Sequence, residues 1–157
     1  ALVFSFLAKN KCLVALYAVK GGNTLAVKNN VRVYINKIDT SEFNYHVKPH
    51  LTALNNPEPH LAPEINFVDA HHYRLLVLNK PGYFPDINPT AITCLVIGNN
   101  FNLTASELLN FKSLKMMVLD VSNNTRTVKR IRNLVKDNPG ITIHDVKISG
   151  AYVHGFN

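Results

Sequence analysis

Residues 115–153 contain an apolar segment, a basic amphipathic segment and two more short apolar segments in close succession, which limits the folds open to the chain. Residues 116–119 are apolar, and the short polar side chains at 120–124 supply turn geometry and N-cap oxygens. A helix is therefore predicted to start near Thr125 and to end at 138–140, where proline and glycine stop it. Its apolar residues have the spacing of one helical face: Val128, Ile131, Leu134 and Val135.

Other strands are predicted in the second half of the chain. Residues 73–78 and 92–97 are apolar runs of strand length that end in turn residues. After the basic helix, residues 141–143 and 151–153 are predicted to be strands joined by a turn at 149–150. The second half is thus expected to consist of two strand–helix units and a final hairpin.

The first forty residues are predicted to form an antiparallel meander without a helix. The apolar run 12–19 is typical of a strand that is buried on both faces. A glycine turn at 20–23 separates it from a second strand at 24–27, and a third strand is expected at 31–35.

Residues 39–69 are predicted to be a long connection. The segment contains several prolines and histidines: Pro49, Pro57, Pro59 and Pro63 with His46, His50 and His60. Because proline removes a backbone donor and restricts the residue before it, we expect only a short helix around 51–54. A second short helix is predicted from the Thr104–Glu107 capping box to about Phe111, because each of the two side chains can bind an otherwise unpaired amide.

These segments predict one α/β (α+β) domain over residues 1–157, with helices packed on a mixed sheet. A chain of 157 residues with 46% hydrophobic residues can bury a sizeable core. Residues 1–8 are apolar enough to be either a strand or a membrane-proximal stub of a preceding membrane helix. Because the chain does not begin with Met, we expect it to be a fragment.

The residue motifs predict no catalytic centre, metal site or cofactor. The chain has seven histidines but no H-x-H, H-E-x-x-H or C-x-x-C motif, and Cys12 and Cys94 are expected to be small core residues. No serine lies in a G-x-S-x-G elbow. Ser122 follows Asp120 just after a predicted strand, and we interpret it as a helix cap.

The predicted helix after Thr125 carries the strongest functional signal. Five cationic residues occupy the arc that its apolar residues leave free: Arg126, Lys129, Arg130, Arg132 and Lys136. The formal net charge is +7, and such a strip can lie along a phosphate backbone. We predict these residues as DNA-binding, with a solvated helix face as the alternative.

Five segments, in this order, carry a resemblance to a known family: residues 13–20 with their glycine turn, 47–49, 120–123, 144–146 and 150–153. With these segments the chain resembles the C-terminal soluble domain of the ComEC family of DNA-uptake channels. In longer ComEC relatives this tail is similar to a metallo-β-lactamase domain, and the chain is similar to its outline.

Several features of that domain are missing from this chain. The strand at 94–97 runs into Gly98-Asn99-Asn100 where the resemblance implies a histidine pair, and 120–126 contains no histidine. The H-x-H-x-D-H loop is absent as well. The resemblance therefore implies a degenerate metallo-β-lactamase-like domain without its metal, which cannot generate hydroxide at neutral pH.

We expect a non-catalytic accessory domain of a membrane DNA-uptake (competence) channel that binds or guides incoming DNA. The alternative is a structural or protein-docking module of the channel, and a third reading is a cryptic metal-dependent hydrolase that uses Asp39, Asp69, Asp120 and some of the histidines. The expected partners are the remainder of the channel and DNA. The resemblance implies a soluble domain of an inner-membrane protein on the periplasmic face.

Overall fold

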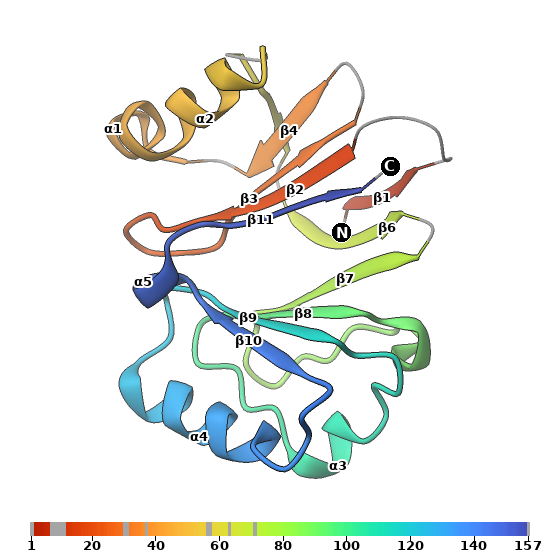
Figure 1. Ribbon diagram of the computed structural model, residues 1–157. Coiled ribbons are helices and arrows are strands. Elements are labelled where there is room, and N and C mark those ends of the chain that lie inside the picture. The colour runs from red at the N-terminus through yellow and green to blue at the C-terminus, as the bar shows by residue number, and fades with distance from the viewer. Residues whose placement is uncertain are drawn as a thin grey trace.

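The computed structural model describes residues 2–6, 12–29, 32–36, 38–55, 58–62, 64–70 and 72–156. It is an α+β fold with two mixed sheets (Figure 1). The six-stranded sheet contains, in spatial order, β1 (Leu2–Phe6), β6 (Ile65–Ala70), β7 (Tyr73–Leu78), β8 (Cys94–Ile97), β9 (Met116–Leu119) and β10 (Thr142–Asp145). The five-stranded sheet contains β11 (Tyr152–Phe156), β2 (Cys12–Tyr17), β3 (Thr24–Lys28), β4 (Val33–Asn36) and β5 (His60–Ala62).

Helices cover the outer face of each sheet. Those over the five-stranded sheet are α1 (Thr40–Glu42), the π-helical η1 (Phe43–Val47) and α2 (Lys48–Ala53), and those over the six-stranded sheet are α3 (Ala105–Leu108) and α4 (Thr125–Val135). The 3-10 helix η2 (Pro89–Ala91) precedes β8, and α5 (Val146–Ser149) links β10 to β11. The predicted fold class is confirmed, although the strands form two sheets.

Three apolar layers hold this stack together. In β2, Val14 and Leu16 pack between the two sheets, whereas Ala15 and Tyr17 pack under η1 and α2. Side chains of β8 alternate in the same way. Val96 packs between the sheets, whereas Leu95 and Ile97 pack under the helices that cover the six-stranded sheet. Strands buried on both faces need apolar residues at every position, which explains their uninterrupted apolar runs.

The N-terminal meander is confirmed. β2, β3 and β4 pair in antiparallel order, and residues 2–6 form a strand that pairs in parallel with β6. The helix after the Thr104–Glu107 capping box is also confirmed, although it ends at Leu108 rather than near Phe111. No helix in the described part of the chain is long and apolar enough to cross a membrane.

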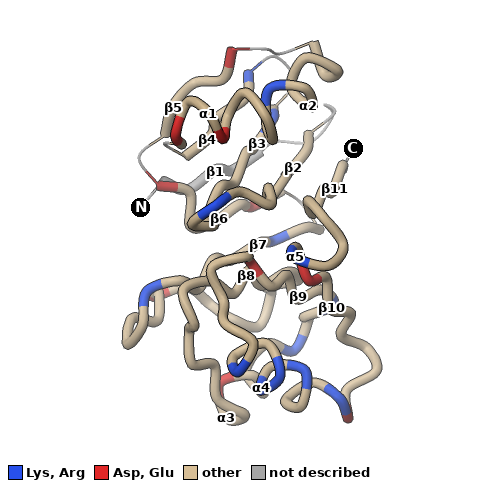
Figure 2. Tube along the Cα trace, turned by 90° about the vertical axis from the view of Figure 1, so that its left-hand side faces the viewer, with Lys and Arg blue, Asp and Glu red and all other residues tan. Residues whose placement is uncertain are grey.

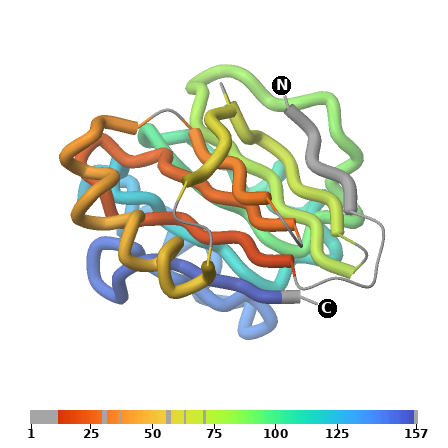
Figure 3. The backbone as a smooth tube through the Cα atoms, turned by 90° about the horizontal axis from the view of Figure 1, so that it is seen from above, coloured from red at the N-terminus to blue at the C-terminus, as the bar shows by residue number. Residues whose placement is uncertain are grey.

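The predicted final hairpin is wrong, because β10 and β11 belong to different sheets. β10 pairs with β9, whereas β11 pairs with β2 and lies beside it in Figure 3. Asp145 caps the intervening helix α5 by accepting a hydrogen bond from the Lys147 amide at 3.1 Å. That helix takes the place of the predicted tight turn and carries the chain from one sheet to the other.

The short helix predicted around 51–54 overlaps the end of α2, but the long connection predicted for the rest of 39–69 is wrong. Asp39 caps a helical segment that runs from α1 through α2, with Val47 and Leu51 buried four residues apart. Pro49 lies at the start of α2, where the π-helical turns of η1 pass into the α-helix. Two strands, β5 and β6, occupy most of the rest. Pro57 and Pro63 lie outside the described residues.

Candidate nucleic-acid interface

The amphipathic helix α4 starts where its sequence predicts and ends at Val135, shortly before the predicted stop at 138–140. It begins at Thr125, and the Asn124 side chain caps it by accepting a hydrogen bond from the Thr127 amide at 2.8 Å. Ile131 and Val135 are buried against the six-stranded sheet. The prediction that Ser122 caps this helix is wrong, because the capping oxygen lies two residues further on.

Two of the five predicted DNA-binding residues lie on the flanks of α4 and contact the domain itself. The Arg130 guanidinium donates hydrogen bonds to the carbonyl oxygens of Leu103 at 2.6 Å and Phe101 at 3.0 Å. Arg132 lies 3.4 Å from the carboxylate of the buried Asp145. These contacts fasten the two flanks of the helix to neighbouring segments.

The other three cationic residues, Arg126, Lys129 and Lys136, are exposed to solvent. Within the described residues no ion pair involves any of them. At 100° per residue they fall within about 80° of one another, on the side opposite Ile131. Lysine and arginine positions gather along α4 in Figure 2. We call Arg126, Lys129 and Lys136 the cationic face of α4.

A network of polar side chains, which we call the polar junction, lies where β7, β8 and β9 end. Its members are Asn23, Asn79, Asn99, Asp120 and Ser122. Asp120 Oδ2 accepts hydrogen bonds from the Asn23 amide at 3.0 Å, the Ser122 amide at 3.1 Å and the Ser122 hydroxyl at 2.6 Å. Ser122 Oγ in turn accepts from the Asn99 amide at 2.8 Å. The network thus connects the β2–β3 turn of one sheet to the strand ends of the other.

The glycine turn at 20–23 lies against Asp120 of this junction, a contact that the sequence does not predict. Gly22 has a φ of 71°, and a Cβ there would lie 2.1 Å from Asp120 Oδ2. The glycine therefore allows the backbone to approach a carboxylate that is only 1% exposed. Asp120 Oδ1 and Asn36 Oδ1 are buried without a hydrogen-bond partner in the described structure.

Asn99 and Asn100, which stand where the resemblance implies a histidine pair, are part of this hydrogen bonding. Both have a positive φ, of 49° and 57°. The Asn100 amide donates to Asn123 Oδ1 at 3.0 Å, and the Asn100 side chain accepts from the Asn124 amide at 2.7 Å. The side chains at this edge of the sheet are therefore engaged with each other.

The histidines and acids are dispersed over the fold. His50 Nδ1 lies 2.7 Å from the Tyr17 hydroxyl, and His144 Nε2 lies 2.9 Å from the Gly150 carbonyl oxygen. Asp39 caps α1, and Asp69 pairs with Arg74 at 3.0 Å. Among the residues that the structure describes, no three His, Cys, Asp or Glu side chains are grouped so that they could hold a metal ion.

Both cysteines are free and buried, as predicted for core residues. Burial raises the pKa of the Cys94 thiol to about 11, so it is not a thiolate at neutral pH. A catalytic cysteine needs an accessible thiolate, and Cys94 lies in the apolar layer between the sheets.

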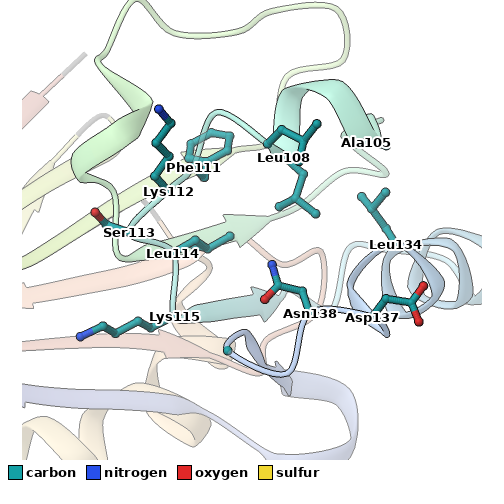
Figure 4. Close-up of a pocket in the computed structure, with 12 residues that line it drawn as sticks. Ala105, Leu108, Phe111, Lys112, Ser113, Leu114, Lys115, Leu134, Asp137 and Asn138 are labelled. Atoms are coloured by element: carbon teal, nitrogen blue, oxygen red, sulfur yellow. The ribbon is translucent and has the colours of Figure 1, made fainter.

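A groove of about 630 Å³ lies between α3 and the C-terminal end of α4 (Figure 4). Apolar side chains from both helices and the segment that follows α3 line it: Leu108, Leu109, Phe111, Leu114 and Leu134. Lys112, Lys115, Asp137 and Asn138 border it. The sequence does not predict this groove, because its lining comes from α3, the end of α4 and the segments that follow them, which only the fold brings together.

These features define a layered α+β domain with one cationic helix face and an adjoining apolar groove. A family model for the ComEC C-terminal domain matches residues 6–156, and the chain belongs to that family. ComEC is a membrane protein of competence DNA uptake, so the chain is part of a DNA-uptake channel. A search of curated proteins finds no match, and a search of solved structures finds none either.

Proposed function

We propose that this domain is a non-catalytic part of the DNA-uptake channel that binds and guides incoming DNA. The observation that carries the proposal is the cationic face of α4, whose three side chains are exposed on a helix anchored at both flanks. A phosphate backbone is the polyanion that such a face can contact in a protein of DNA uptake. We place the domain at the periplasmic side, beside the remainder of the channel.

The geometry favours a weak and sequence-independent contact. Arg126 and Lys136 are ten residues apart, which is about 15 Å along a helix, and Lys129 lies between them. If each cation neutralises one phosphate, log K falls with log salt with a slope of about −2.7 for a duplex and about −2.1 for a single strand. A contact of this size suits a strand that must move on through a channel.

The proposal that the domain is non-catalytic is supported by the polar junction. Its side chains are mainly amides and hydroxyls, and the one carboxylate, Asp120, is occupied on Oδ2 by three donors. Such groups supply neither the imidazole ligands of a hydrolytic zinc site nor an activated nucleophile. We accordingly propose that the metallo-β-lactamase-like outline is degenerate.

The test is fluorescence anisotropy of labelled single-stranded and duplex DNA, titrated with the chain at low and physiological salt. The variant Arg126→Glu/Lys129→Glu/Lys136→Glu is expected to lose binding. A matched control, Lys20→Glu/Arg32→Glu/Lys48→Glu, makes the same change in net charge at exposed residues of the other half. If both variants lose binding equally, the cationic face is not the site.

A second candidate function is docking of a protein partner. The specific observation in its favour is the groove between α3 and α4, because solvent-accessible apolar grooves in soluble domains are often interaction sites. The groove and the cationic face adjoin but share no residue, so the two functions do not exclude each other.

A further inference from the structure

The groove between α3 and α4 presents apolar side chains that the fold holds in place. Leu109 is 79% exposed at its edge, and Leu108 lies across from Leu134 in Figure 4. The helix α3 is fixed by its capping box, in which Thr104 Oγ1 accepts from the Glu107 amide at 3.2 Å and Glu107 accepts from the Thr104 amide at 2.8 Å. An apolar residue that is held rigidly in water is a suitable anchor for a partner.

The groove has two apolar walls, and its volume is about 630 Å³. Leucines line it on two sides, from α3 and from α4. A bound helix would place apolar anchors at positions i, i+3 or i+4 and i+7 between those walls.

The charges around the groove favour an acidic partner over a second copy of this chain. Lys112 and Lys115 are exposed at the left rim of the groove in Figure 4, with their ammonium groups directed outward, and neither makes an ion pair within the described residues. Asp137 is the one acid that lines the groove. A second copy of this chain, with its net charge of +7, would bring further lysines to the surface. An acidic partner instead meets charges of opposite sign.

We propose that this groove docks an acidic amphipathic helix of a protein partner. Leucine-like anchors of that helix lie on Leu108, Leu109 and Leu134, and its carboxylates pair with Lys112 and Lys115. The inference rests on the docking function proposed above and is independent of DNA binding.

The test uses a fluorescein-labelled peptide of about 14 residues, or about four helical turns, with leucines at i, i+3 or i+4 and i+7 and glutamates beside them. A second peptide has lysine in place of each glutamate. The glutamate peptide is expected to bind the wild-type chain more tightly than the lysine peptide. Lys112→Glu/Lys115→Glu is expected to weaken its binding at least tenfold, and Leu109→Ser at least fivefold.

Controls separate the outcomes of this test. Arg32→Glu/Lys48→Glu makes the same charge change away from the groove and is expected to bind the glutamate peptide within twofold of wild type. Equal binding of both peptides that is lost in Leu109→Ser would overturn the acidic partner but leave docking standing. Binding of neither peptide would overturn docking itself. Sedimentation that shows a dimer, lost in Leu109→Ser, would assign the groove to a second copy and also overturn the proposal.

Discussion

Gly22 shows how one residue links the turn of one sheet to the buried carboxylate of the other. A Cβ at Gly22 would lie 2.1 Å from Asp120 Oδ2, and the φ of 71° also disfavours a side chain. Gly21 has a similar φ of 85°, but nothing lies within 4 Å of its added Cβ. A comparison of substitutions at Gly21 and Gly22 therefore separates the cost of backbone strain from the cost of the steric clash with Asp120.

We predict that Gly22→Ala destabilises the fold more than Gly21→Ala. The strain of a positive φ costs about 1–2 kcal/mol at either position. Displacement of Asp120 adds about 2 kcal/mol or more at Gly22 alone. The free energy of unfolding from urea titrations measures both. Equal losses in the two variants would show that the contact with Asp120 contributes nothing.

Partial burial of two histidines predicts a dependence of stability on pH. Desolvation lowers the pKa of His154, which stacks on Tyr73 with ring centroids 4.3 Å apart, and also lowers the pKa of His50. The unfolded chain therefore binds more protons than the folded chain below the ordinary histidine pKa of about 6.5. Stability is present in full above that pH and is lost as the pH falls toward the lowered values.

Urea midpoints between about pH 7.5 and 5.5 test this prediction, because carboxylates titrate below that range. We expect the midpoint to fall with pH in the wild-type chain and to fall less in His154→Phe, which keeps a ring against Tyr73. A midpoint that drops equally in both proteins would contradict the assignment to His154.

At the scale of elements, α4 combines residues that fasten the helix with residues that face solvent. Arg130→Gln removes two charged hydrogen bonds and is expected to cost about 1.5–3 kcal/mol of stability. Arg126→Gln removes the same charge from an exposed position and is expected to change stability by less than about 0.5 kcal/mol. For DNA affinity we expect the reverse order, with the greater loss in Arg126→Gln.

Urea titration and DNA anisotropy on the same two proteins check this prediction, and the equal change in net charge makes each variant a control for the other. If Arg130→Gln weakened DNA binding more than Arg126→Gln in a fully folded protein, the division between anchoring and solvent-facing residues would be wrong.

The elements that the sequence predicted correctly are those whose signals are local. The apolar face of α4 and the Thr104–Glu107 capping box depend on residues three or four positions apart, and both are present. Of the helical segment from α1 to α2, only the end is predicted, as a short helix around 51–54, because proline is a helix breaker in most positions. Pro49 lies in the first turn of α2. Val47 and Leu51 are four residues apart on one helical face, and they pack on the five-stranded sheet, which the sequence did not predict as a separate sheet.

At the scale of the whole molecule, the partition of the strands into two sheets was not predictable. Strands such as β2 and β8 are apolar at nearly every position because both of their faces are buried, so their patterns do not distinguish the sheets. The polar junction was hidden for a related reason. Asn23, Asn99 and Ser122 each look like ordinary turn residues, and only the packing of the sheets brings them together.

The polar junction predicts that the two sheets lose local stability together when Asp120 is removed. Asp120→Ala frees the Asn23 amide in one sheet and the Ser122 groups that hold Asn99 in the other. We expect a loss of about 3 kcal/mol or more, because hydrogen bonds to a charged group are each worth about 1.5–3 kcal/mol. Hydrogen exchange should accelerate at residues 22–25 and 97–101 alike. Asp39→Ala, which removes the cap of the helical segment that begins with α1, is the control and should affect neither range. The Lys20 amide is left out of the comparison because it donates a hydrogen bond to Glu42 of α1. Faster exchange in only one of the two ranges would mean that the sheets are joined by their apolar layer and not by this carboxylate.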